Sequence, residues 1–218
     1  MIETHAEQVH QALTHLGVHA GSGLLLHSAL QYLGRPQGGP GMYLNVLRSL
    51  LGTQGTLAVP AFNFGFARGE PFDPASTPSR GMGVFSELVR QQPDAQRTTH
   101  PLQSLAVIGR FAGDLCQRDT LSAFDPGSAF ERLLELDFDL LLLGADIQAA
   151  SMVHYSEQKA VVPYRYWKDF NGQVRTPQGW MEKTYRMFVR NMQIDPQLRL
   201  LPIQTELQRR GQWQQQTL

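Results

Sequence analysis

Apolar positions along the chain fall into two patterns. Stripes of apolar residues three or four apart are typical of amphipathic helices, and short unbroken apolar runs are typical of buried strands. We expect helices near residues 3–16, 42–51, 84–91, 109–117, 128–135, 151–160 and 203–210, and strands near 23–26, 56–59, 105–108 and 138–143. A hairpin is expected from 173–176 and 182–190. The succession of strand, helix and strand between residues 23 and 59 predicts a parallel pair.

These elements predict an α/β fold with a central mixed, largely parallel sheet flanked by helices. We expect a single domain over residues 1–218, with a core at 1–168 and a small appendage at 169–218 that holds the hairpin and the last helix. The length supports this, because 218 residues can bury a substantial core in one domain. Twenty Gly and thirteen Pro, many of them between residues 34 and 82, indicate a face rich in loops.

Composition narrows the classes of partner. The formal net charge is zero, so nothing favours nucleic acid or a charged membrane surface. No apolar run approaches the roughly 20 residues of a membrane helix, and the first residues lack the pattern of a signal peptide. Cys116 is the only cysteine, which excludes an internal disulfide and a cysteine-rich metal site. We therefore expect a cytoplasmic protein with no nucleic-acid or membrane partner, and the sequence leaves a homodimer open.

The strongest strand signal is the apolar run 138–143, which we expect to be buried on both faces. A polar segment follows, with Asp146 and then His154 and Glu157 three residues apart. If 151–160 is helical, His154 and Glu157 share one face of one turn. Such a pair at the edge of a sheet can perform acid/base chemistry. A solvated helix face gives the same pattern and is the commoner case.

Three other segments next to predicted strands carry candidate chemistry. They are His27 with Ser28, Phe62 with Asn63, and residues 100–104. Because ligands of open α/β sheets bind outside the carboxyl ends of the strands, His27, His100 and His154 could share one cleft. The glycine motifs of dinucleotide and phosphate loops are absent, as is the nucleophile elbow of serine hydrolases. A zinc site from His100, His154 and Asp146 has suitable ligand types but no diagnostic spacing, so we expect no metal.

Several short motifs also follow one another in a recognisable order. They occupy residues 26–34, 55–62, 72–79, 82–83, 97–106, 127–134, 141–144 and 154–157. In this order they resemble the aminoglycoside 3-N-acetyltransferase family, over about residues 20 to 168. The combination is specific although each motif alone is weak. The resemblance implies transfer of an acetyl group from acetyl-CoA to an amine of a small-molecule amino sugar or aminoglycoside, without a metal.

The resemblance implies roles for the candidate catalytic residues. His154 and Glu157 match the His-x-x-Glu motif of the family, which makes His154 the general base for direct transfer, a task that suits a His. Glu157 is expected to orient His154 or to bind a cationic amine, and Asp146 is a second candidate for either task. His100 and Ser104 match the His-Pro-x-x-Ser segment, with His100 supporting the site.

Contacts with acetyl-CoA are expected at two strand ends. The first is made up of His27, Ser28, Ala29 and Leu30, where exposed N–H groups could polarise the thioester carbonyl as in an oxyanion hole. The second is made up of Phe62, Ser104 and Ala106, with Ser104 facing the pantetheine arm. Substrate contacts are expected at Asp73, Tyr164 and Arg165. For Asp73, a turn-forming role before Pro is equally compatible with the sequence.

The chain departs from the family in length and in charge. It is some tens of residues shorter, so we expect a more open pocket, a different substrate or an incomplete version of the fold. The cleft segments have few acids, although a polycationic aminoglycoside favours carboxylates. Residues 164–168 instead hold Tyr, Arg and Trp, which suit a nucleotide-linked or phosphorylated sugar or simply pack a sheet edge. Two alternatives therefore stay open: acylation of a nucleotide-linked or surface-polysaccharide amino sugar, and a non-catalytic acyl-CoA- or sugar-binding protein.

Overall fold

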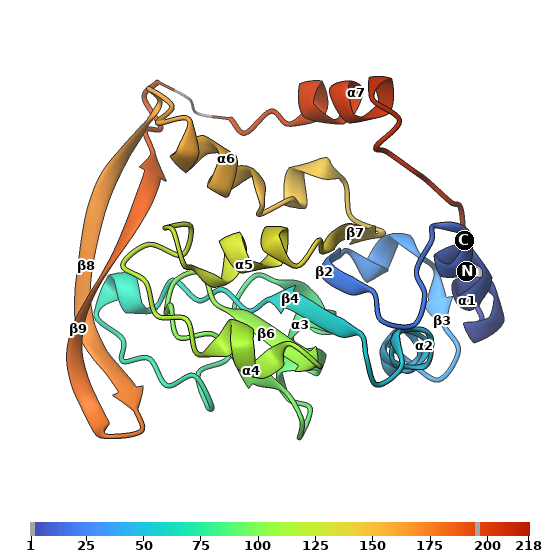
Figure 1. Cartoon of the computed structure of the whole chain (residues 1–218), viewed down its shortest axis with the longest axis horizontal. Helices are drawn as coiled ribbons and strands as arrows, with labels where there is room; N and C mark the ends of the chain where they lie inside the picture. Colours follow the sequence, from blue (N-terminus) through green and yellow to red (C-terminus); the bar gives the residue numbers. More distant parts are fainter. Residues whose placement is uncertain (1–2, 195–196) are drawn as a thin grey trace.

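A five-stranded sheet forms the centre of the protein in the computed structural model, which describes residues 3–194 and 197–218 (Figure 1). Its order is β5-β6-β4-β2-β7. The strands are β2 (Gly23–Ser28), β4 (Thr56–Pro60), β5 (Gln96–Arg97), β6 (Leu105–Gly109) and β7 (Asp139–Leu143). β2 pairs in parallel with β4 and β7, whereas β6 pairs antiparallel with β4 and β5. The predicted mixed α/β fold is confirmed.

Helices cover both faces of this sheet. On one face lie α1 (Ala6–His15), α2 (Gly41–Leu51) and α3 (Gly83–Arg90), and on the other α4 (Ala112–Cys116), α5 (Ala129–Glu135) and α6 (Val153–Lys159). Side chains alternate along a strand, so each strand supplies both layers. Leu24 and Leu26 of β2 pack with the first set of helices, and Leu25 packs with the second. None of the helices in the described residues is long and apolar enough to cross a membrane.

The prediction that the run 138–143 is buried on both faces is wrong. β7 is one of the two edge strands of the sheet, and burial increases only toward its carboxyl end. Leu140 is 38% exposed, whereas Leu143 is buried. An unbroken run of leucines is compatible with a central or an edge strand, and only the order of the strands distinguishes the two.

A long hairpin stands at one end of the molecule (Figure 1, left). It consists of β8 (Arg165–Thr176) and β9 (Gly179–Arg190), twelve residues each, and it begins eight residues earlier than predicted. Both of its edges bond to loops of the core: the Arg175 N–H donates to the Phe72 oxygen at 2.8 Å, and the Arg186 N–H donates to the Leu121 oxygen at 2.7 Å. On one face, Val174 and Tyr185 of the hairpin pack with Phe66, Phe72 and Leu102 of the core. The hairpin is therefore docked firmly on the core.

The remaining elements are small. β1 (Glu3–Thr4) and β3 (Arg35–Pro36) form a separate parallel pair, and three 3₁₀ turns lie at η1 (Leu30–Tyr32), η2 (Phe66–Arg68) and η3 (Ile147–Ala149). The last helix, α7 (Leu201–Arg209), contains no buried residue and contacts η3 (Figure 1, top).

Candidate active site

The helix α6 carries the predicted acid/base pair. His154 Nδ1 lies 2.7 Å from Glu157 Oε2, one turn further along the helix. The Glu157 side chain is only 5% exposed, whereas that of His154 is 26% exposed. The ring of Phe124 lies against His154, with 6.0 Å between the ring centroids. A solvated helix face would expose both side chains, so the commoner alternative does not apply here.

Two residues from the start of the hairpin complete the surroundings of Glu157. Tyr164 donates its hydroxyl hydrogen to Glu157 Oε1 at 3.1 Å. The Nη2 atom of Arg165 lies 2.7 Å from Glu157 Oε2, and the Arg165 side chain is 9% exposed. Both carboxylate oxygens are therefore engaged by the chain itself. Tyr164 and Arg165, predicted to contact substrate, are placed against the predicted orienting residue.

A strained turn brings these residues back to α6. Val161 has a φ of 48°, in the left-handed region that a β-branched residue rarely adopts. This conformation lets the Val161 N–H donate to the Gln158 oxygen at 3.2 Å and the Val162 N–H donate to the Glu157 oxygen at 3.3 Å. The chain then reverses within a few residues, so that β8 starts beside the helix it has just left.

The charges around Glu157 keep its carboxylate ionised. Burial raises the pKa of Glu157, but hydrogen bonds from His154 and Arg165 and their charges outweigh burial, so the pKa lies below its usual value. An ionised carboxylate at this position accepts the Nδ1–H of His154. The Nε2 of His154 then carries the free lone pair, which is the tautomer that a general base needs.

A second histidine supports the start of α6. His27, at the end of β2, is 6% exposed, and its Nε2 accepts from the Ser151 N–H at 3.3 Å and lies 3.1 Å from the Ser151 Oγ. Burial, with a smaller contribution from His154, lowers the pKa of His27 to about 4. His27 is therefore neutral at pH 7 and fastens the helix that carries His154 to the central sheet. No pattern in the sequence indicates this contact of Ser151.

The far side of α6 is fastened to the neighbouring helix and loop. Tyr155 donates to Glu131 at 3.0 Å. Gln158 donates from Nε2 to Asp125 at 2.8 Å and accepts through Oε1 from the Ser122 hydroxyl at 2.7 Å. The orientation of α6 is therefore fixed from β2, from α5, from the loop at 121–126 and from the hairpin.

His100 lies beneath the hairpin, where its ring contacts Gln103 and Tyr185. Its Nδ1 accepts from the Gln103 N–H at 3.2 Å, and its ring packs edge-on against Tyr185 with 5.0 Å between centroids. Burial lowers the pKa of His100 to about 4. The surroundings of His100 are those of a neutral core residue that supports the hairpin.

The two predicted aspartates shape turns. Asp146 is exposed and accepts from the Gln148 N–H at 2.9 Å at the start of η3. Asp73 accepts from the Ala75 N–H at 2.9 Å and from the Ser76 hydroxyl at 3.0 Å. These bonds match the turn-forming alternative for Asp73. No group of three or more His, Cys, Asp or Glu within the described residues is arranged to hold a metal ion.

The residues predicted to contact acetyl-CoA lie at or near the carboxyl ends of β2 and β4, and they differ in their access to solvent. Because β6 is antiparallel to β4, Ser104 reaches the carboxyl end of β4, where its hydroxyl donates to the Ala61 oxygen at 2.9 Å. Ser104 and Ala106 have no exposed surface, and Phe62 and Leu30 are also buried. Ser28 and Ala29 are half-buried, but the Ala29 N–H already donates to the Leu143 oxygen at 2.9 Å. That N–H is therefore not available to a thioester carbonyl.

The buried Arg97 next to Ser104 was not anticipated. Its Nε donates to the Ser104 hydroxyl at 2.9 Å, and its Nη groups donate to the carbonyl oxygens of Ala61 and Thr77. Its guanidinium also lies over the Phe72 ring, 4.9 Å from the centroid. Burial lowers the pKa of Arg97 to about 10. These contacts tie the loop at 61–79 to the sheet edge.

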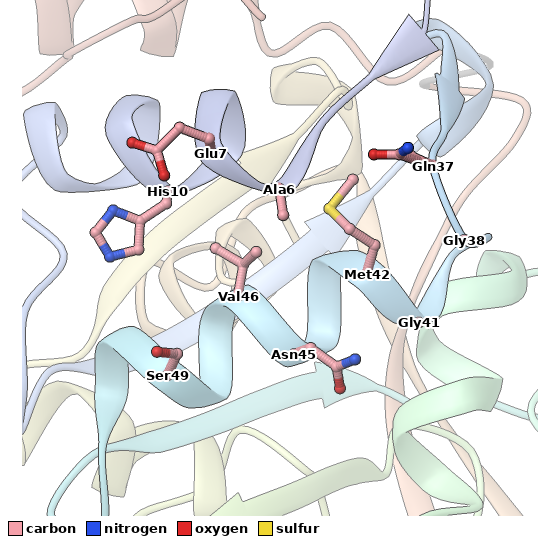
Figure 2. A pocket seen from close by; sticks show the side chains of 10 residues that line it. All are labelled: Ala6, Glu7, His10, Gln37, Gly38, Gly41, Met42, Asn45, Val46 and Ser49. Carbon is pink, nitrogen blue, oxygen red and sulfur yellow. The ribbon is translucent and has the colours of Figure 1, made fainter.

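A hollow of about 490 Å³ lies elsewhere, between α1 and α2 (Figure 2). It is lined by Glu7 and His10 of α1 and by Asn45 and Ser49 of α2, with Met42 between the two helices. All four polar side chains are exposed, so the hollow offers no desolvated group to a ligand. None of its lining residues belongs to the predicted site, and we place the candidate site at α6, where the buried charges are.

The comparisons with known proteins decide the family. The family model described as aminoglycoside 3-N-acetyltransferase matches residues 25–218. The chain belongs to the aminoglycoside 3-N-acetyltransferase family. The resemblance predicted from the motif order is confirmed, and the match extends beyond residue 168 into the hairpin and the last helix.

Curated relatives within the aminoglycoside 3-N-acetyltransferase family are longer than this chain. The aminoglycoside N(3)-acetyltransferase III of a Salmonella species is 31% identical over 181 residues, covering 72% of this chain and 61% of the relative. An aminoglycoside N(3)-acetyltransferase IV, also from a Salmonella species, is 34% identical over 160 residues, covering 73% of this chain and 60% of the relative. The chain thus spans less than two thirds of the length of these relatives.

Solved structures of the same family share the fold. A structure titled AAC-IIIb binary with CoASH matches with a TM-score of 0.87 at 24% identity, covering 99% of this chain and 88% of that one. The apoenzyme of aminoglycoside acetyltransferase AAC(3)-IVa matches with a TM-score of 0.79 at 27% identity, covering 97% of this chain and 78% of that one. A His-to-Ala mutant of AAC(3)-IVa, solved with apramycin, matches with a TM-score of 0.78 at 25% identity, covering 97% of this chain and 81% of that one.

Proposed function

We propose that this chain is an N-acetyltransferase that uses acetyl-CoA to acetylate an amine of an aminoglycoside or related amino sugar, with His154 as the general base. The observation that carries the proposal is the geometry of His154, whose Nδ1 is held by the buried carboxylate of Glu157 while its side chain stays partly exposed. Family membership supports the substrate class, because relatives are named aminoglycoside acetyltransferases and related structures are titled with CoASH and with apramycin.

The reaction needs one proton removed and one returned. The neutral amine attacks the thioester carbonyl carbon, a C–N bond forms and the C–S bond breaks. The Nε2 of His154 takes the proton that the attacking nitrogen loses, and the departing thiolate of CoA takes up a proton to leave as the thiol. A base of this kind accelerates such a step by roughly 10²- to 10⁴-fold.

Glu157 acts in this proposal as the residue that orients His154. Its carboxylate receives donors from His154, Tyr164 and Arg165 and is nearly inaccessible to solvent. A cationic substrate amine would have to displace one of these donors. Direct binding of substrate by Glu157, the other role considered above, is therefore disfavoured.

Acetyl-CoA is proposed to lie along the carboxyl end of β2, next to the half-buried Ser28 and Ala29. This places its acetyl group toward α6, because His27 in the same strand end bonds to Ser151 at the start of that helix. Ser104, Ala106 and Phe62 then serve as the packed support of the edge, and contact with the pantetheine arm comes from residues nearer the surface.

Release of CoA thiol from acetyl-CoA in the presence of an aminoglycoside panel tests the activity. We expect turnover with at least one member, and we expect His154→Ala to lower kcat/KM at least about 100-fold. His10→Ala, which changes an exposed His on α1, is the matched control and should leave kcat/KM unchanged. Equal turnover by the His154→Ala and unchanged proteins would refute the role of His154.

An exposed aromatic side chain beside an Arg makes nucleotide-linked amino sugars a second candidate substrate class. Trp167 is 44% exposed on β8, and the guanidinium of Arg186 lies 5.7 Å from its ring centroid. An aromatic face beside an Arg suits a nucleotide-linked sugar. The panel therefore includes nucleotide-linked amino sugars, and turnover of these alone would favour that alternative. Absence of acetyl-CoA binding in calorimetry would refute the enzyme and leave a sugar-binding role.

A further inference from the structure

The guanidinium of Arg165 lies against both members of the His154–Glu157 pair. Its Nη2 is 2.7 Å from Glu157 Oε2 and 3.1 Å from His154 Nδ1, and its Nη1 donates to the Phe188 oxygen at 2.9 Å. A fixed positive charge therefore faces the ring that is proposed to take up a proton. A substrate-binding Arg would point its fork away from the protein, and this one points inward.

The three groups cannot all bond to one another. Arg165 has only donors, so it can bond to His154 Nδ1 only if that nitrogen carries no hydrogen. The 2.7 Å contact of Nδ1 with Glu157 requires the opposite, because an ionised carboxylate only accepts. The consistent arrangement has His154 and Arg165 both donating to Glu157 Oε2. The Arg165–His154 contact is then an approach of two donors that share one acceptor.

The other described groups that contact or face His154 carry no second positive charge at pH 7. Glu157 of the same helix is the shared anion, and Tyr164 reaches its other oxygen. From β2, His27 is neutral at pH 7, and the loop at 121–126 presents the uncharged ring of Phe124. Within the described residues, Arg165 is the cation whose contacts place it against this pair.

We propose that Arg165 is a positioning residue: it holds Glu157 on the Nδ1 side of His154, and its charge disfavours protonation of the ring, so that the base stays free at lower pH. The inference rests on the proposed role of His154 as the base. Glu157 alone would stabilise the protonated ring, and Arg165 offsets this by competing for the same oxygen. A cation within about 4 to 6 Å changes such an equilibrium by roughly 1 to 3 pH units.

The direct test is an NMR titration of the His154 ring in the unliganded protein, which does not depend on activity. We expect Arg165→Gln, which keeps a donor and loses the charge, to move the His154 midpoint up by about one pH unit. Arg165→Lys keeps the charge and should stay within a few tenths of a unit. Arg165→Met should also move the His154 midpoint up, and it is used in place of Arg165→Gln if Arg165→Gln does not fold.

The pH profile of kcat/KM separates positioning from a merely structural role. For Arg165→Gln we expect the acid limb to move with the NMR midpoint, which gives about tenfold lower kcat/KM at acidic pH and a retained plateau at high pH. A merely structural role would lower kcat/KM by the same factor at every pH, including the plateau. Arg175→Gln changes an exposed Arg of the same hairpin whose guanidinium lies over Trp180, 5.7 Å from its ring centroid, and it should change neither measurement.

Two outcomes are decisive. An unchanged His154 midpoint in folded Arg165→Gln overturns this inference and leaves the proposed function intact. A midpoint that moves while the acid limb stays in place supports the electrostatic role of Arg165, and it refutes His154 as the base, which is the proposed function.

Discussion

Three histidines near strand ends occupy three different environments. His27 is buried and accepts from Ser151, His100 is buried beneath Tyr185, and His154 is partly exposed beside an ionised Glu157. Desolvation lowers the pKa of the first two to about 4, because no carboxylate bonds to either ring. Only His154 combines access with an anionic partner, and this combination distinguishes a candidate base from a buried structural histidine.

His100 should therefore make stability depend on pH. Its folded pKa lies below the unfolded value of about 6.5, so the unfolded chain binds more protons between these values. The contribution of His100 to the free energy of unfolding is then constant above about pH 6.5 and falls as the pH drops toward 4. At pH 5 the loss from His100 alone is about 2 kcal/mol.

Urea unfolding of His100→Asn at pH 7 and pH 5 checks this. The Asn oxygen can accept the Gln103 N–H in place of Nδ1, and Asn does not titrate. The stability of the variant at pH 7 can differ from that of the unchanged protein by any amount. Between pH 7 and pH 5, however, its free energy of unfolding should fall by about 2 kcal/mol less than that of the unchanged protein. Identical losses would mean that His100 is not buried in its neutral form.

Helix α6 shows how one element can be held from several directions. Contacts from α5, the loop at 121–126 and the hairpin converge on its seven residues, and His27 of β2 holds Ser151 just before them. A helix of two turns has little stability of its own, so these contacts hold its side chains in place. The left-handed turn at Val161 belongs to the same arrangement, and it makes the last of these contacts possible.

Val161→Asn should stabilise the protein. Val161 is 70% exposed, so little packing is lost, and Asn tolerates the left-handed conformation that costs a β-branched residue roughly 1 kcal/mol. We expect the free energy of urea unfolding to rise by about 1 kcal/mol. Asp137, exposed and with a φ of 55°, offers the inverse control, because Asp137→Val should lower stability by a similar amount. A loss of stability in Val161→Asn would contradict this account of the turn.

At the scale of the whole molecule, the hairpin and the sheet meet at a shared carboxylate. Asp119 accepts from the Tyr185 hydroxyl at 2.8 Å, from Thr99 at 3.1 Å and from the ammonium group of Lys183. Burial raises the pKa of Asp119, but Lys183 and Tyr185 outweigh it and keep the carboxyl ionised. Since the hairpin also begins with Arg165, the docking of the hairpin and the geometry at His154 are mechanically connected.

Asp119→Asn should loosen this docking. We expect the free energy of unfolding to fall by roughly 1 to 3 kcal/mol, because the buried Tyr185 and the partly exposed Lys183 lose a charged acceptor. Hydrogen exchange of β9 amides should quicken while exchange in β2 stays slow. Asp169→Asn, which breaks an exposed pair with Arg186, is the control and should cost less than about 1 kcal/mol. Equal exchange in β9 of Asp119→Asn and the unchanged protein would rule out an anchoring role.

The sequence predicted those features whose signal is local. The main helices and strands have clear periodicity, and the His154–Glu157 pair lies within one helical turn. Residues 165–172 alternate polar and aromatic side chains without a clean period, so the first half of β8 was missed. The two-residue strands β1, β3 and β5 are too short to carry any pattern.

Contacts between distant segments could not be predicted in this way. Ser151 and His27 are 124 residues apart, and nothing in either segment indicates the other. The contact of Arg165 with Glu157 was missed for a different reason, because a basic residue after the helix at 153–159 is equally compatible with substrate binding. Only the direction of its side chain, toward Glu157, distinguishes the two roles.

The backbone between Glu157 and Arg165 is held along most of its length by hydrogen bonds. Hydrogen bonds from Val161 to Gln158, from Val162 to Glu157 and from Arg165 to Val162 fix its path. In genetic terms, losing one codon from 161–163 in frame would remove no catalytic side chain and leave the sheet untouched. It would still pull Arg165 away from the carboxylate, because the hairpin is anchored to the core. The number of residues in this turn is therefore as much a requirement of the site as the identity of the residues around it.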